Sequence, residues 1–258
     1  MTRIAFAGDR HSAVECLAIL LDSDVRPHVL MVSAPELATH SELLREMSGL
    51  DSEHVLVGRQ FRDPASIELL RSLDLDYILG VHFPYIVPGQ VLEIPRIGVL
   101  NLHPALLPYN RGWHTPNWAI LDETPIGATL HFMDSGVDTG DIVAQAELEI
   151  RPEDTAHTLY GRLLELEVEL FREAWPLLAS GSPPRRPQSP EEGTNHVRAE
   201  LRSDSIRRLD LEATVPVEDT LRTLRALTTN HVGEAAYFEV DGRRYRVQVT
   251  ITPESTEA

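Results

Sequence analysis

An α/β fold is predicted by the sequence: a Rossmann-like, mostly parallel sheet with flanking helices, followed by a small α+β segment at the C-terminal end. Over the first hundred residues, short apolar runs alternate with longer segments of helical character, which is the pattern of parallel strands joined by helical crossovers. Beyond residue 104, two runs alternate polar and apolar residues, which is typical of half-buried strands. The length allows one main domain with an appendage.

The first part of the chain contains five expected strands and three expected helices. The strands are the apolar runs Ile4–Ala7, Val29–Val32, Val55–Val57, Tyr77–Val81 and Gly98–Leu102. The helices are expected at His11–Leu21, Pro35–Met47 and Pro64–Leu73. A proline is tolerated in the first turn because its missing N–H has no helical partner there. Only Gly8 follows the first strand before the helix, so the G-x-G-x-x-G loop that binds nicotinamide and flavin cofactors is absent.

The later elements are two hairpins and two helices. The runs Ile126–Met133 and Ile142–Ile150 flank a loop of Asp and Gly residues, which predicts a hairpin. A helix then begins after Thr155, with leucines along one stripe. The last elements are an amphipathic helix at Val217–Leu227 and a hairpin with an Asp-Gly turn, formed by Ala235–Val240 and Arg243–Ile251.

A stretch rich in Pro, Ser and Arg lies between the two helices and has no apolar period, which is typical of a linker or surface strap. We therefore expect a main domain at residues 1–180, a linker or strap at 181–195 and a small helix-and-hairpin region at 196–258. Arg185 and Arg186 in the strap are expected to be solvated surface charges.

The composition excludes several classes of function. The 258 residues carry 40 acidic and 23 basic side chains, a formal charge of −17 at pH 7, so the chain lacks the positive field that nucleic-acid binding requires. All 23 basic residues are arginine, which excludes a Schiff-base lysine, pyridoxal-phosphate attachment and a P-loop lysine. The lone Cys16 excludes an internal disulfide, and no apolar run is long enough to span a membrane. We expect a cytoplasmic protein with no nucleic-acid or membrane partner.

Polar residues suited to catalysis lie at the end of the fifth predicted strand. Asn101 and His103 are two residues apart, so they share one face of that strand, while Leu100 and Leu102 occupy the other. Pro104 ends the pairing because it has no N–H. The polar pair therefore lies at a carboxyl edge of the sheet, where open α/β folds bind ligands. A purely structural alternative is that both side chains satisfy loop backbone groups.

Acidic residues fill the loop of the first hairpin, at Asp134, Asp138 and Asp141. A carboxylate beside His103 would fix the tautomer of the imidazole and favour its charged form, as in histidines that transfer protons. Calcium binding is an alternative, but the remaining oxygen ligands and the terminal Glu of an EF-hand are missing. Binding of another metal by the scattered histidines is disfavoured, because closely spaced Cys or His ligands are absent.

Four segments in this order resemble the signature of the folate-dependent formyltransferase family. They are Asn101-x-His103-Pro104, Leu107-Pro108-x-x-Arg111-Gly112, Thr129-x-His131 and Asp138-Thr139-Gly140-Asp141. The resemblance implies that residues 1–180 form the catalytic domain, that N10-formyltetrahydrofolate is the co-substrate, and that no metal is needed. It also implies a catalytic trio of Asn101, His103 and Asp138. Within the family, the stretch 108–114 and the tail 224–228 are most similar to the nucleotide-sugar N-formyltransferases.

The resemblance further implies which residues contact the two substrates. The folate donor is expected to contact Val81, Phe83, Tyr85, Ile86, Val87, Ser135, Gly136 and Val137. The acceptor is expected to be a dTDP-linked 4-amino-4,6-dideoxyhexose, and its expected contacts are Tyr109, Asn110, Arg111, Gly112, Trp113 and Asn117. Similar sugar enzymes usually pair, so we expect a homodimer.

The chemistry suits these residues. The formyl group of the donor is an activated acyl group, so an amine can attack it directly and the enzyme needs no nucleophile. Asn101 and His103 can stabilise the negative oxygen of a tetrahedral intermediate. His103 and Asp138 can move the protons.

Other acceptors and other classes of function stay open. A methionyl-tRNA acceptor is disfavoured because residues 196–258 hold 9 Arg against 11 acidic residues, without the basic surface that such a partner needs. Phosphoribosyl-glycinamide is disfavoured because Gly8-Asp9-Arg10 departs from the Gly-x-Gly-Ser-Asn phosphate loop of that branch. N-hydroxyornithine is a further possible acceptor. Hydrolysis of formyltetrahydrofolate uses the same three residues, and a folate-binding module without turnover is the remaining alternative.

Overall fold

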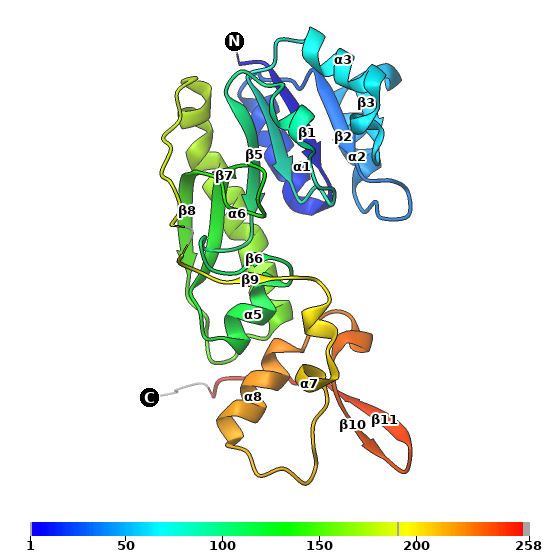
Figure 1. The fold of residues 1–258 in the computed structure, drawn as a ribbon, viewed down its shortest axis with the longest axis vertical. Coiled ribbons are helices and arrows are strands. Elements are labelled where there is room, and N and C mark those ends of the chain that lie inside the picture. The colour runs from blue at the N-terminus through cyan, green and yellow to red at the C-terminus, as the bar shows by residue number, and fades with distance from the viewer. Residues whose placement is uncertain (1, 190, 255–258) are drawn as a thin grey trace. The chain divides into compact units, whose positions relative to one another are not determined.

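The structure is a computed structural model and describes residues 2–189 and 191–254 (Figure 1). The chain forms two compact units. Unit 1 comprises residues 1–103, 128–146 and 165–190, and unit 2 comprises residues 104–127, 147–164 and 191–258. The division into three parts that we expect from the sequence stays a prediction.

A seven-stranded sheet organises the fold, with the order β3-β2-β1-β4-β5-β7-β8. The strands β1 to β5 run parallel, and β7 runs antiparallel to β5. The bounds are β1 Ile4–Gly8, β2 Val29–Val32, β3 Val55–Val57, β4 Tyr77–Val81, β5 Gly98–His103, β7 Ile126–Phe132 and β8 Ile142–Leu148. The predicted α/β fold with a mostly parallel sheet is confirmed, because continuous apolar runs mark strands that are buried on both faces.

The helices follow the expected order. They are α1 Arg10–Asp22, α2 Ser41–Ser48, α3 Pro64–Ser72, α4 Gly89–Leu92, α5 Thr115–Leu121, α6 Ala156–Ala179, α7 Asp204–Arg207 and α8 Val217–Ala226. Short 3-10 turns are η1 Ser52–His54, η2 Gln60–Arg62, η3 Glu200–Arg202 and η4 Val232–Glu234. The small strands are β6 Arg111–Gly112, β9 Asn195–His196, β10 Ala236–Val240 and β11 Arg243–Val247.

The expected helix at Pro35–Met47 is wrong over residues 35–40, because α2 begins only at Ser41. The buried carboxylate of Asp9 accepts hydrogen bonds from the backbone N–H of Thr39 at 3.1 Å and of His40 at 2.9 Å. It also caps α1 by accepting from the N–H of Arg10 at 2.8 Å. Burial by itself would raise the pKa of Asp9, but these hydrogen bonds outweigh it and lower the pKa. The segment before α2 is therefore fixed by a side chain from the end of β1.

Two different sets of helices cover the two faces of the sheet. Leu100 and Leu102 of β5 pack in one layer with α1, α2 and the C-terminal part of α6. Val99 of β5 packs in the other layer with α3 and α4. Cys16 is fully buried in the first layer, where burial raises the pKa of its thiol well above the usual value. This cysteine is therefore a core residue.

Unit 2 contains the small C-terminal elements. Ile120 of α5, Leu159 of α6 and Ala226 of α8 share one apolar cluster. The side-chain amide of Asn117 donates to the backbone carbonyl of Ala226 at 2.6 Å, which fixes α8 on α5. The strands β10 and β11 form the predicted antiparallel hairpin. The expected α+β segment is therefore confirmed.

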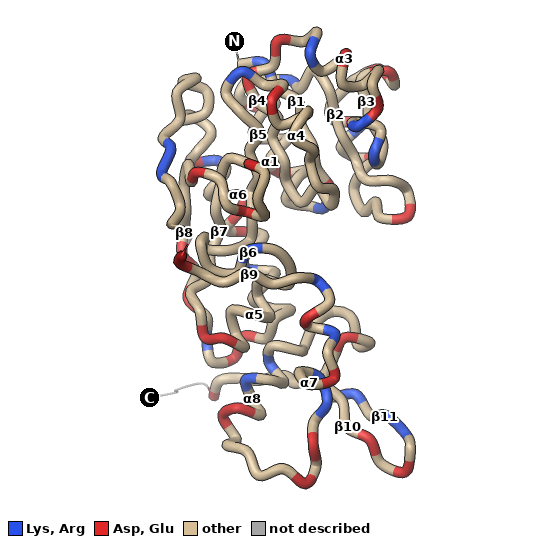
Figure 2. Tube along the Cα trace, in the orientation of Figure 1, with Lys and Arg blue, Asp and Glu red and all other residues tan. Residues whose placement is uncertain are grey.

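The acidic excess of the sequence is distributed over the fold. Figure 2 shows red acidic segments along both units, and every blue segment is arginine because the sequence has no lysine. Within residues 2–189 and 191–254, no helix combines the length and the apolar character that a membrane span requires.

Candidate active site at the carboxyl end of β5

The pairing of β5 with β7 brings four polar residues onto one face of the sheet. Asn101 lies opposite His131, and His103 lies opposite Thr129. β5 ends at His103 because the next residue is proline, which has no N–H to pair. The face is the one that carries Val99, since the alternate residues of β5 are buried in the other layer. The shared face of Asn101 and His103 is thus as the alternation predicts.

The loop after β7 places a carboxylate against this group. The Oδ2 atom of Asp138 lies 3.5 Å from Nε2 of His103, and its Oδ1 atom lies 3.7 Å from Nε2 of His131. The side chains of His103, His131 and Asp138 are 8%, 1% and 14% exposed. Asp138 has a φ of +53°, so the backbone is left-handed at the residue that presents the carboxylate. The structure therefore brings together residues that are up to 37 positions apart in the sequence.

The two histidines have different electrostatic environments. Burial lowers the pKa of His131 to about 4, and the charge of Asp138 only partly opposes this. Nδ1 of His131 lies 2.8 Å from the carbonyl oxygen of Phe132, which can only accept, so Nδ1 carries the hydrogen. Nε2 is then an acceptor, and it lies 3.3 Å from the amide nitrogen of Asn101. His131 is therefore neutral and orients the Asn101 amide, which leaves His103 as the candidate proton carrier.

The buried neutral His131 predicts a pH-dependent stability. Between pH 6.5 and about pH 4, the unfolded chain binds a proton at residue 131 and the folded chain does not. The free energy of unfolding therefore falls by about 3 kcal/mol as the pH falls through this window, and it is fully present above pH 6.5. Urea denaturation at pH 7, 5.5 and 4 checks this against His131→Gln, which removes the titrating group. Parallel pH dependences of the two proteins would contradict the assignment.

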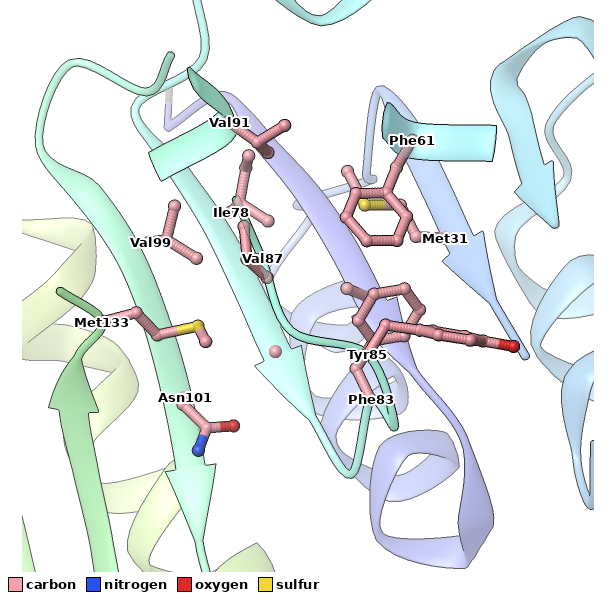
Figure 3. Close-up of a pocket in the computed structure, with 12 residues that line it drawn as sticks. Met31, Phe61, Ile78, Phe83, Tyr85, Val87, Val91, Val99, Asn101 and Met133 are labelled. Atoms are coloured by element: carbon pink, nitrogen blue, oxygen red, sulfur yellow. The ribbon is translucent and has the colours of Figure 1, made fainter. Parts of the chain in front are cut away.

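A pocket opens on the same face of the sheet, next to Asn101 (Figure 3). The residues that line it are Ala7, Met31, Phe61, Ile78, Gly80, Phe83, Tyr85, Val87, Val91, Val99, Asn101 and Met133. The rings of Phe61 and Phe83 meet edge to face with centroids 5.4 Å apart, and those of Phe83 and Tyr85 are 5.0 Å apart. The pocket thus has an aromatic wall, with a polar amide at its border.

The pocket contains some of the predicted donor residues and several that the sequence did not indicate. Phe83, Tyr85 and Val87 line it, and their contact with the donor stays a prediction. Phe61 and Met133 were missed, because no local pattern shows that η2 and the start of the hairpin loop reach this face. The pocket residues on β1, β2 and β4 could have been predicted from the two-residue period of a strand. They lie on the same face of the sheet as Val99 and Asn101.

The other residues that we predict to contact the folate donor lie elsewhere in unit 1, and their roles stay predictions. Val81 packs in the core layer on the opposite face of the sheet. Ile86 is 81% exposed, and its carbonyl accepts a hydrogen bond from Arg62 at 2.5 Å. Ser135, Gly136 and Val137 form the exposed tip of the hairpin loop.

Two side-chain contacts fix the loop that carries Phe83 and Tyr85. Nε2 of His82 lies 2.6 Å from Oε2 of Glu167, and these side chains are 9% and 0% exposed. The backbone N–H of Ala34 donates to the hydroxyl of Tyr85 at 3.0 Å. Sequence patterns did not indicate the pair of His82 with Glu167, since a histidine in a loop and a glutamate in a helix carry no shared local signal. In the part of the chain that the structure describes, no group of three or more metal-ligating side chains occurs.

The residues predicted to bind the acceptor lie in unit 2, and several of them support the fold there. The amide of Asn110 donates to the hydroxyl of Thr124 at 2.9 Å. Arg111 and Gly112 form β6, which pairs with β9, and Tyr109 is half-buried in the preceding turn. Trp113 is different, because its indole is 46% exposed and the guanidinium carbon of Arg198 lies 5.0 Å from the ring centroid. The roles of all six residues in binding stay predictions.

Comparison with known proteins identifies two family models along the chain. The family model for formyl transferase matches residues 25–175, and the model for the N-formyltransferase dimerization C-terminal domain matches residues 203–253. A dTDP-4-amino-4,6-dideoxyglucose formyltransferase of Mycobacterium bovis is 33% identical over 181 residues, which cover 69% of this chain and 74% of the relative. A methionyl-tRNA formyltransferase of Syntrophus aciditrophicus is 41% identical over 128 residues, 49% of this chain and 41% of the relative. The match to the Clostridioides difficile enzyme of that name spans 63% of its length.

Comparison with solved structures also finds formyltransferases. The structure of a sugar N-formyltransferase from a Shewanella species has a TM-score of 0.81, covers 99% of this chain and 100% of its own, and is 21% identical, which shows the shared fold. A formyltransferase from Anoxybacillus kamchatkensis is 30% identical, with a TM-score of 0.55, and covers 76% of this chain and 97% of its own. Since the family model matches more than half of the 258 residues, this chain belongs to the formyl transferase family, as the four motifs predict.

Proposed function

We propose that this protein transfers the formyl group of N10-formyltetrahydrofolate to the amine of a nucleotide-linked amino sugar. The observation that carries the proposal is the convergence of Asn101, His103 and Asp138 beside a pocket with an aromatic wall. The Mycobacterium bovis relative, which by its name acts on a dTDP-4-amino-4,6-dideoxyglucose, supports this substrate class. The Anoxybacillus kamchatkensis structure contains tetrahydrofolate and a UDP-linked formamido sugar, which supports both substrates.

The pocket in unit 1 presents apolar and aromatic side chains that suit the flat ring system of a folate. Phe61, Phe83 and Tyr85 offer aromatic contact. Gly80 packs closely against β5, since a Cβ there would lie 3.1 Å from the carbonyl oxygen of Leu100. Phe83, Tyr85 and Val87 would hold the ring system. When bound, the donor supplies a formyl carbon that is already activated for attack by an amine.

Each of the polar residues then has its own role in the transfer. The Asn101 amide, oriented by neutral His131, donates to the formyl oxygen as it gains negative charge, and one such donor contributes about 2.7–4 kcal/mol in measured cases. The attacking amine loses a proton, for which Asp138 and His103 are the acceptors. The leaving nitrogen of the donor takes a proton, which His103 can return. No group of the enzyme needs to bond covalently to the formyl carbon.

The acceptor class is also supported by unit 2. Residues 203–253 match the N-formyltransferase dimerization C-terminal domain, and the net charge of −17 disfavours a tRNA partner. The exposed indole of Trp113 beside Arg198 offers a flat surface and a positive charge, which suit a nucleotide base and its phosphates.

Turnover of the donor with a panel of acceptors tests the proposal. We expect tetrahydrofolate to form only when a dTDP-linked 4-amino-4,6-dideoxyhexose or a related amino-sugar nucleotide is present. Formation without any acceptor would instead identify a hydrolase. Formation only with methionyl-tRNA or N-hydroxyornithine would overturn the acceptor, and donor binding without turnover would identify a binding module.

We also propose a homodimer, supported by the match of residues 203–253 to a dimerization domain. Sedimentation velocity checks this, and a sedimenting species with the mass of one 28.9 kDa chain at micromolar concentration would contradict it.

The cytoplasm is the proposed location, supported by the free, buried Cys16.

A further inference from the structure

A short segment after α6 packs against the loop that carries Asp138. This segment, residues 182–189, is called the strap below, and it belongs to unit 1 together with the loop. The backbone N–H of Arg186 donates to the carbonyl of Ile142 at 3.0 Å, and the N–H of Ile142 donates back to Arg186 at 2.8 Å. The strap is therefore bonded to the first residue of β8, directly after the loop.

Gln188 of the strap bonds to the loop itself. Its side-chain nitrogen donates to the carbonyl oxygen of Asp138 at 2.9 Å and to that of Gly140 at 2.7 Å. A side-chain amide nitrogen has two hydrogens, so one group can satisfy both carbonyls at once. The two backbone positions are thereby held at a fixed separation on either side of Thr139.

The loop needs such support at this position. Asp138 is left-handed, with a φ of +53°, a conformation that is uncommon for residues other than glycine. Gly140 is packed so closely that a Cβ there would lie 2.0 Å from the carbonyl oxygen of Phe132. The tip of the loop, at Ser135 and Val137, is exposed. The hydrogen bonds of Gln188 therefore fall where the backbone is strained and where the carboxylate originates.

The two arginines of the strap are exposed, as expected of surface charges, and they also add to this contact. The guanidinium carbon of Arg185 lies 3.5 Å from the ring centroid of Phe132, and its Nη1 lies 3.7 Å from Oδ2 of Asp141. Arg186 donates to the side-chain carbonyl of Gln145. Gln145 in turn donates to the hydroxyl of Thr129 at 3.0 Å, and Thr129 is the residue opposite His103.

We propose that Gln188 is a positioning residue, which holds the loop so that the carboxylate of Asp138 faces His103. The proposal rests on the proposed function only for the role of Asp138 in turnover. Gln188 itself contacts no reacting atom, since its hydrogen bonds go to backbone carbonyls. Its effect is therefore expected on the rate of the chemical step and not on the affinity for the acceptor, whose predicted contacts lie outside this loop, at residues 109–117.

Two substitutions separate the hydrogen bonds from the volume of the side chain. Gln188→Met keeps the length and removes the donors, whereas Gln188→Glu places an anion against two carbonyl oxygens. We expect kcat to fall about 10- to 100-fold in both variants, since an ångström-scale misplacement of a catalytic group costs about 10²-fold. The KM for the acceptor should stay within about threefold, because its predicted contacts lie outside this loop.

Gln248→Met is the matched control. The amide of Gln248 also donates to a backbone carbonyl, that of Thr229, at 2.7 Å, so this variant loses the same kind of bond at another place. Its kcat should equal that of the wild type. Introduced into Asp138→Asn, Gln188→Met should have no further effect on kcat, because the group that it positions has lost its charge.

A crystal structure of Gln188→Met supplies a readout that does not depend on turnover. We expect the Asp138 carboxylate to lie beyond the 3.5 Å that separates it from Nε2 of His103 in the wild type. An unmoved carboxylate, an unchanged kcat, or an equal loss of kcat in the Asp138→Asn background would each overturn the proposal. Absence of formyl transfer by the wild type would refute the proposed function, while the structural comparison would still decide the role of Gln188.

Discussion

Replacement of His103 by asparagine lowers kcat by about 10³-fold and leaves the Kd of the donor within about threefold of the wild type. Asparagine keeps a hydrogen-bond donor at the end of β5 but cannot take or give a proton, so the variant removes proton transfer and little else. The pocket proposed for the donor is lined by other residues, among them Phe83 and Tyr85, so binding should be retained. Steady-state kinetics together with equilibrium binding of the donor measures both quantities.

His11→Asn is the control for this variant. His11 lies in α1 with its Nε2 atom 3.6 Å from Oε1 of Glu15, and its side chain is 70% exposed. It is therefore a histidine at nearly the same distance from a carboxylate as His103, 3.6 Å against 3.5 Å, but at the surface. Its replacement should leave kcat unchanged. A His103→Asn enzyme that retains a tenth or more of the wild-type kcat would refute the role of His103 as the proton carrier.

Replacement of Asp138 by asparagine lowers kcat by about 10²- to 10³-fold while the fold persists. The side chain keeps its size, and asparagine tolerates the left-handed backbone, with φ of +53°, as well as aspartate does. What disappears is the negative charge 3.5 Å from His103, and with it the carboxylate that would accept the proton of the amine. Kinetics and thermal denaturation of the same preparation separate the loss of rate from any loss of stability.

Asp241→Asn makes the same change in a matched setting. Asp241 lies in the turn between β10 and β11 and has a φ of +51°, so it tests whether asparagine is accepted at a left-handed position. The melting temperatures of both variants should stay within a few degrees of the wild type. If Asp138→Asn unfolds on heating much earlier than Asp241→Asn, its loss of rate reflects folding and the assigned role fails.

The strands could be predicted closely because each is an apolar run of the length that crosses a sheet buried on both faces. The run Tyr77–Val81, for example, is observed as β4 with unchanged bounds. The shared face of Asn101 and His103 also follows from a local rule, the two-residue period of a strand. The helix predicted at Pro35–Met47 is wrong over its first residues for a non-local reason. The start of α2 depends on a carboxylate from Asp9, 32 positions earlier.

No local sequence pattern showed how the residues around the site support it. His131 belongs to a motif that the sequence shows, but its neutral state arises from burial and from the carbonyl of Phe132. The sequence placed Gln188 in a region with the composition of a linker, yet its amide bonds to the loop of Asp138, 50 positions away. The aromatic wall likewise combines Phe61 with residues that follow β4.

The order of strands and helices, the family motifs and the types of the reacting groups are properties of the sequence alone, because periodicity and spacing act over a few residues. The positions of those groups could not be predicted from local patterns. A hydrogen bond, a buried charge or a pocket needs partners that only the folded chain brings within a few ångströms. Tertiary structure therefore decided that Asp138 faces His103, that His131 stays neutral and that Gln188 holds the loop between them.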